Sequence, residues 1–202
     1  MALWVIAIAF IQNPANNIAT SIDNGIERIQ YANLYFFSWL TFLAAVYTIG
    51  VTFRDNFQFG ARFGQWMLLF TASIVLLSTS VSAHGDICQY YEGQLQCDRV
   101  KYAVAVGGVG IAISAISVLL SMFDKMSRTV EIAATGLATV LYFFGVIFLT
   151  SASGPAKVMG NMYFSLWGGC TISFALLIGV LFPGSQESQV DNSGVSHQED
   201  QI

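Results

Sequence analysis

Few side chains in this sequence could do chemistry, and two cysteines are the most informative of them. Cys88 and Cys97 flank the short polar stretch Gln-Tyr-Tyr-Glu-Gly-Gln-Leu-Gln. Two cysteines this close in one loop favour a disulfide, which persists on the luminal or extracellular side of a membrane. We predict a Cys88–Cys97 disulfide in such a loop, with two free thiols as the alternative. Cys170 lies inside an apolar stretch and is interpreted as a packing residue.

The other titratable side chains form no recognisable catalytic or metal-binding motif. His84, Asp124 and Glu131 are candidates for acid–base chemistry only because they titrate. Asp124 and Glu131 belong to a short charged segment with Lys125 and Arg128, interpreted as solvated loop charge. The two histidines and three cysteines are too scattered along the sequence for a zinc motif. We predict no enzyme activity, no catalytic residue, no metal and no cofactor.

The elements that must carry these residues are five long stretches without Asp, Glu, Lys or Arg. Each holds at least about twenty mostly apolar residues, the length that a helix needs to cross about 30 Å of hydrocarbon. We place membrane helices at 32–53, 63–83, 101–122, 131–151 and 161–182. The sequence predicts an all-α, multi-pass transmembrane helical bundle with five spans.

Composition agrees with a membrane protein. Apolar residues make up 55% of the chain and charged residues 10%, which separates it from soluble domains of similar length. The net charge of −4 excludes the basic surface that nucleic-acid binding needs. Membrane lipids, other membrane subunits or further copies of the chain are therefore the expected partners, and the apolar spans leave room for lipid or pigment.

The two ends of the chain differ from the spans. Residues 1–12 are apolar but too short to span, and could alternatively form the core of a signal peptide. Asn13-Pro14 then predicts the start of an amphipathic helix, lying in the membrane interface or packed on the bundle as a linker. Its apolar face would hold Ile18, Ile22, Ile26 and Ile29. Residues 183–202 form a polar, acidic tail.

Charge alone does not orient the bundle, because four basic residues fall on each side of the five spans. The predicted disulfide decides between the two orientations. We expect the 88–97 loop and the N-terminus outside, and the 54–62 loop, the 123–130 loop and the acidic tail in the cytosol.

The first and last spans resemble each other, which indicates an internal repeat. Asn33-Leu-Tyr-Phe-Phe-Ser-Trp39 and Asn161-Met-Tyr-Phe-Ser-Leu-Trp167 share four residue types at equal offsets, and Ile-Gly-Val recurs near both helix ends. Tyr35, Trp39, Tyr163 and Trp167 would lie at the membrane interface, and that preference could by itself produce part of the match. Four crossings separate the copies, so the two helices should run parallel. Residues 63–182 would then be one four-helix unit, and 32–53 the last helix of an earlier copy.

The third span is rich in small residues, which let membrane helices approach closely. We predict that Gly107, Gly108 and Gly110 pack against another helix, with Gly168 and Gly169 forming a similar notch in the last span. The partner helix could belong to this chain, making the third span the centre of the bundle, or to another molecule.

The middle of the chain resembles a known family. The run Cys97-Asp-Arg-Val-Lys-Tyr-Ala-Val-Ala-Val-Gly-Gly-Val-Gly, preceded by Cys88, is similar to the first luminal loop and second helix of synaptogyrin-like and physin-like MARVEL proteins. Arg62-Phe-Gly-Gln-Trp-Met-Leu-Leu-Phe resembles their first span. The likeness covers about 63–182, and the chain departs from it in the extra upstream span and in lacking a long Tyr-rich tail. It implies a four-helix protein of membrane organisation or trafficking without catalysis.

Three functions fit these observations. The first is a non-enzymatic membrane-organising protein or scaffold. The second is a small structural subunit of a large membrane complex, photosynthetic or respiratory, in contact with pigment or lipid. A channel or transporter fits less well, since it needs polar or ionisable groups at mid-membrane and the predicted spans carry no ionisable side chain.

Overall fold

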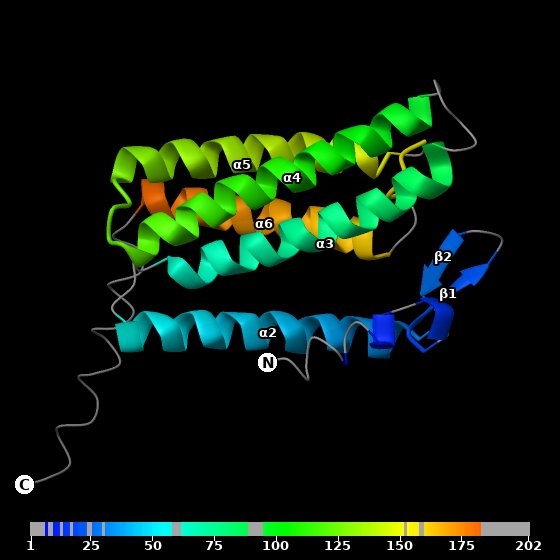
Figure 1. The fold of residues 1–202 in the computed structure, drawn as a ribbon, viewed down its shortest axis with the longest axis horizontal. Helices are drawn as coiled ribbons and strands as arrows, with labels where there is room; N and C mark the ends of the chain where they lie inside the picture. The colour runs from blue at the N-terminus through cyan, green and yellow to red at the C-terminus, as the bar shows by residue number, and fades with distance from the viewer. Residues whose placement is uncertain are drawn as a thin grey trace, which may run out of the picture.

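Five long helices dominate the computed structural model, which describes Ala7 and residues 10–12, 14–16, 18–23, 26–29, 31–57, 62–88, 95–151, 153–157 and 160–182. They are α2 (Ala32–Phe57), α3 (Phe63–Cys88), α4 (Leu95–Met122), α5 (Arg128–Leu149) and α6 (Asn161–Leu181) (Figure 1). All five are long and apolar enough to cross a membrane. The chain is an integral membrane protein with the predicted all-helical bundle.

The helix bounds differ from the predicted spans mainly where polar residues continue a helix beyond the apolar stretch. α4 begins at Leu95 rather than at Lys101, so its first turns include Asp98, whose negative charge suits a helix N-terminus. α5 begins at Arg128 because the Ser127 hydroxyl caps it, accepting a hydrogen bond from the Val130 amide at 3.4 Å. The apolar stretches alone therefore place the starts of both helices too late in the sequence.

The predicted amphipathic helix near the N-terminus is wrong. After a short 3-10 helix at Pro14–Asn16, strands β1 (Thr20–Asp23) and β2 (Ile26–Ile29) pair antiparallel, with Thr20 opposite Ile29. The isoleucines recur every three or four residues along the sequence, which predicts one helix face, but Ile22 lies in β1 whereas Ile26 and Ile29 lie in β2. Asn-Gly stands between the strands in the sequence and is a strong hairpin signal. The signal-peptide alternative for 1–12 and the tail at 183–202 fall largely outside the described residues.

Helices α3 to α6 form a four-helix unit, and α2 lies on its outside against α3 (Figure 1). Within the unit, α3 packs on α4 and α6, and α5 packs on α4 and α6. The centre is filled by large side chains from every helix of the unit. They include Trp66, Leu69, Leu76, Val106, Tyr142, Leu166 and Leu176.

The two repeated helices run in the same direction, as predicted. Both α2 and α6 begin at the end of the bundle that carries the β hairpin and finish at the opposite end (Figure 1). Parallel copies agree with duplication of a four-helix unit and with the prediction of five crossings.

Candidate functional site

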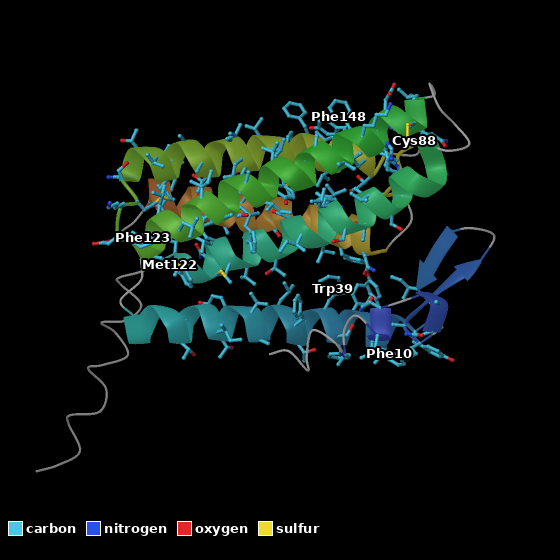
Figure 2. The ribbon with its side chains drawn as sticks, viewed as in Figure 1. Phe10, Trp39, Cys88, Met122, Phe123 and Phe148 are labelled. Carbon is cyan, nitrogen blue, oxygen red and sulfur yellow. A yellow bond between two sulfur atoms is a disulfide. The ribbon has the colours of Figure 1, made fainter. Side chains whose placement is uncertain are left out.

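The repeated segments at the start of α2 and α6 contact each other directly. The Tyr35 hydroxyl donates to the Asn161 side-chain oxygen at 2.9 Å, and the Trp39 indole N–H donates to the same oxygen at 3.2 Å. The Tyr35 ring also lies against Phe164, with ring centroids 5.5 Å apart. Figure 2 places Trp39 on the side of α2 that faces the four-helix unit. One asparagine thus joins the outer helix to the unit.

The interface position of the four aromatic residues stays a prediction, and Tyr35 has in addition a contact inside the bundle. Its side chain is fully buried, and a buried tyrosine hydroxyl needs a partner, which Asn161 supplies. Trp167 is 42% exposed and pairs with Tyr163 at 6.3 Å between ring centroids, an arrangement compatible with the predicted interface position. The asparagine in the repeated motif signalled a polar contact that the interpretation as an aromatic belt missed.

The repeated glycines near the other ends of α2 and α6 both contact the start of α3. A Cβ on Gly50 would lie 2.7 Å from the Gly64 Cα, so α2 and α3 touch through their backbones here. On α6, the Gly179 carbonyl accepts a hydrogen bond from the Arg62 guanidinium at 2.7 Å. The start of α3 therefore holds the two repeated helices at the end opposite Asn161.

Arg62 also makes an ion pair that sequence reasoning missed. Its guanidinium lies 2.7 Å from a Glu131 carboxylate oxygen, and the two side chains are 22% and 11% exposed. The interpretation of Glu131 as solvated loop charge is therefore wrong, because Glu131 lies in the first turn of α5 and faces the bundle. Asp124, Lys125 and Arg128 are exposed, as expected. Arg62 thus connects α3, α5 and α6.

The small residues of α4 pack against other helices only in part. A Cβ on Gly107 would lie 2.8 Å from the Leu77 amide nitrogen, and one on Gly110 would lie 2.8 Å from the Ser73 hydroxyl oxygen. The prediction is confirmed for these two residues. Within this chain Gly108 has no such partner, since its added Cβ would meet nothing within 4 Å. Only one side of α4 faces α3, and Gly108 points away from it.

In α6, one of the two glycines predicted to form a notch packs against a neighbouring helix of this chain. The Tyr142 ring of α5 lies directly against Gly169, while a Cβ on Gly168 would meet nothing within 4 Å. All these glycine contacts are made with helices of the same chain. Gly107, Gly110 and Gly169 therefore pack inside the bundle, the first of the two alternatives, while contact of Gly108 and Gly168 with another molecule stays a prediction.

Serine and threonine hydroxyl groups line the interior of the four-helix unit. In the part of the chain that the structure describes, most of them donate a hydrogen bond to a backbone carbonyl of their own helix. Ser73 donates to the Leu69 carbonyl at 2.7 Å and also shares a buried 2.8 Å hydrogen bond with the Tyr142 hydroxyl. Ser114 and Thr135 donate to carbonyls one turn earlier, at 2.6 and 2.8 Å. These bonds satisfy polar groups that would otherwise be costly inside a membrane.

The disulfide lies at the end of the bundle where α3 finishes and α4 begins. Cys88 and Cys97 are bonded with their Cα atoms 5.0 Å apart, which confirms the predicted pair (Figure 2). His84 lies one turn before Cys88, and its ring nitrogen and the two sulfurs are all within 4.8 Å of one another. These three residues lie within one short segment of the sequence, so the prediction that the histidines and cysteines are too scattered overlooked this cluster. A pocket of about 220 Å³, lined by Val81, His84, Lys101 and Val104, opens beside it.

Comparison with known proteins identifies no similar protein. No model of a known protein family, no curated protein and no solved structure matches this chain. The resemblance to MARVEL proteins therefore stays a prediction from the residues that carry it.

Proposed function

We propose that this chain is a non-enzymatic membrane-organising protein, in which the α3–α6 unit is a MARVEL-like scaffold that presents α2 to a partner helix in the membrane. We place the disulfide end on the luminal or extracellular side and the loop between α4 and α5 in the cytosol. The chemistry of the bundle interior and an open face of α2 support this proposal.

The interior of the unit is suited to packing. Among the described residues of the spans, one carboxylate is buried, that of Glu131. It forms an ion pair with the Arg62 guanidinium, with 2.7 Å between the nitrogen and the oxygen. The hydroxyls at Ser114 and Thr135 are engaged by carbonyls of their own helices. Pathways for ions or protons depend above all on ionisable groups at mid-membrane, and the described spans hold no Asp, Glu, Lys, Arg or His there, so this interior favours a scaffold over a transporter.

The observation that carries the proposal is a mismatch between the two repeated helices. Counted from Asn161, the buried face of α6 includes Ser165, Gly169, Leu176 and Val180. At the same offsets from Asn33, the residues of α2 are Phe37, Thr41, Thr48 and Thr52, which we call the open α2 face. All four are exposed. Much of the face that is covered in α6 is thus exposed in α2, although Ser38, the counterpart of Leu166, is buried.

The open α2 face suits another membrane helix. Thr48 and Thr52 donate their hydroxyls to carbonyls of α2 itself, each at 2.8 Å. Beyond Phe37, the face therefore presents threonine methyl groups, which allow close approach between helices. It carries no charge, so the expected partner is an apolar helix with a similarly smooth surface.

Site-specific photo-cross-linking in intact membranes tests this proposal. A photoreactive amino acid at Thr48 should give a discrete adduct with one protein, and the same protein should be captured from Thr41. The matched control is Val140, which is 54% exposed on α5. The Val140 probe should give lipid adducts only. If the probes at Thr41 and Thr48 also give only lipid adducts, the open α2 face contacts lipid and the proposal is wrong.

A permanent subunit of a larger membrane complex is the second candidate, and the same open α2 face favours it. The two functions differ in how the partner is held. A subunit should co-purify with its cross-linked partner at fixed stoichiometry in mild detergent. A membrane organiser should lose the partner on extraction and keep the Thr48 adduct only when cross-linked before extraction.

A further inference from the structure

Among the residues that the structure describes, three side chains at the disulfide end of the bundle could together hold a metal ion. His84 and Cys88 are one turn apart on α3 and so share a helix face, while Cys97 comes from the start of α4. We propose that reduction of the Cys88–Cys97 bond converts this cluster into a Zn²⁺ site, with His84, Cys88 and Cys97 as ligands. The disulfide and the metal would be alternative links between α3 and α4.

The geometry of the cluster is close to that of a tetrahedral zinc site. Bond lengths of about 2.3 Å to sulfur and 2.0–2.1 Å to nitrogen place ligand atoms about 3.5–3.8 Å apart. The ring nitrogen of His84 and both sulfurs already lie within 4.8 Å of one another. Small side-chain rotations, together with separation of the two sulfurs, would complete three of the four ligand positions.

The surroundings suit a bound metal that remains accessible to solvent. Cys97 is fully buried and Cys88 is 9% exposed, so two thiolates there would be shielded on the bundle side. His84 also lines the pocket with Val81 and Lys101, which gives a route for the ion to enter. A water molecule from this pocket would occupy the fourth position.

The conversion balances as a two-electron exchange followed by metal binding. A dithiol reductant donates two electrons and two protons to the Cys88–Cys97 bond and becomes a disulfide itself. The two thiols then bind Zn²⁺ as thiolates and release two protons, while neutral His84 binds through a ring nitrogen. Two thiolates neutralise the charge of the ion, so the complex adds no net charge to the end of the bundle.

Cobalt titration of the full-length chain in detergent micelles tests the proposal, because Co²⁺ reports tetrahedral thiolate coordination by its visible spectrum. The protein is reduced with a dithiol and desalted without oxygen before the titration. The reduced protein should bind one Co²⁺ per chain, with a sulfur-to-cobalt charge-transfer band, and Zn²⁺ should displace it. The oxidised protein should show no such band. Equal spectra from the two forms would overturn the proposal.

Substitutions separate the three proposed ligands from other sites. His84→Ala should weaken Co²⁺ binding by at least about tenfold, the lower end of the loss that even an outer-shell change causes at metal sites. His197→Ala and Cys170→Ser are the matched controls and should bind as the unaltered chain does. In each variant, formation of the disulfide after reoxidation and an unchanged circular dichroism spectrum show that the helices are intact. Undiminished binding by a folded His84→Ala protein would contradict the assignment.

Zn²⁺ should also protect the cysteines from alkylation in the reduced protein. Maleimide labelling of Cys88 and Cys97, read by peptide mass spectrometry, should slow in the presence of Zn²⁺, while labelling of Cys170 should not change. If Zn²⁺ slows the labelling of all three cysteines equally, it acts on the whole protein, and the proposed site does not exist.

Discussion

At the scale of single residues, neighbouring glycines of one helix have opposite roles. Gly107 lies against the Leu77 backbone, whereas Gly108 has open space where a side chain would be. Glycine in a helix costs stability unless close packing compensates for it. That compensation exists at Gly107 and is absent at Gly108.

Alanine substitution of the two glycines should therefore change stability in opposite directions. Gly107→Ala places a Cβ 2.8 Å from the Leu77 amide nitrogen and should destabilise the protein by about 1–3 kcal/mol, as overpacking does. Gly108→Ala should stabilise it by about 0.5–1 kcal/mol by removing the entropic cost of glycine. Unfolding in detergent micelles measures both. Equal effects at the two positions would mean that α4 does not face α3 as described.

The asparagine of the repeated motif gives a second matched pair. Asn161→Leu would leave the Tyr35 hydroxyl and the Trp39 indole N–H without their shared acceptor, at a cost of about 1–2 kcal/mol. Asn33 has the same place in the other copy but is exposed, so Asn33→Leu should cost much less. The two unfolding free energies, measured under one condition, provide the comparison. A larger loss for Asn33→Leu would contradict the contact between the copies.

At the scale of helices, the Arg62 side chain connects three of them, α3, α5 and α6. Arg62 bonds Glu131 of α5 and the Gly179 carbonyl of α6. Arg62→Met should destabilise the bundle by about 2–4 kcal/mol, somewhat less than the 3–5 expected for a fully buried pair, because the arginine side chain is 22% exposed. Replacing both Arg62 and Glu131 by Met should recover most of that loss.

The control for this prediction is the exposed pair between Lys101 and Asp98 on α4. Their side chains are 56% and 66% exposed, and their charged atoms are 3.8 Å apart. Lys101→Met should change stability by at most about 1 kcal/mol. If Arg62→Met is equally harmless, the pair at the start of α3 does not hold the helices together.

The helices differ in how well their sequences predicted them. Charge-free apolar stretches located all five, because a membrane imposes one length and one composition on every span. The β hairpin was not predicted because the isoleucines repeat at helical spacing along the sequence, although the Asn-Gly pair between Ile22 and Ile26 is a strong hairpin signal.

Polar contacts between distant segments were the part of the site that could not be predicted. Glu131 lies beside exposed charged residues in the sequence, yet its partner Arg62 is 69 residues away. The side of α4 that Gly107 faces depends on the rotation of the helix, which its evenly apolar sequence does not fix. The Cys88–Cys97 bond was predictable because the two cysteines flank one short connection, at the end of α3 and the start of α4.

At the scale of the whole molecule, five crossings and parallel repeated helices are the basis of every other conclusion. The inference from the open α2 face requires that α2 crosses the membrane in the same direction as α6. The residues before α2 and before α6 lie at the same end of the bundle as the disulfide, and the loop between α4 and α5 lies at the other end. Five crossings predict that these two ends lie on opposite sides of the membrane.

Labelling of single cysteines in sealed vesicles measures this arrangement directly. Tyr31→Cys, Asp124→Cys and Lys157→Cys, each made with Cys170→Ser, place one thiol at exposed positions. A maleimide that cannot cross the membrane should label Tyr31→Cys and Lys157→Cys from the same side, and Asp124→Cys from the other. Labelling of Tyr31→Cys together with Asp124→Cys, and opposite to Lys157→Cys, would show that α2 does not run parallel to α6 across the membrane.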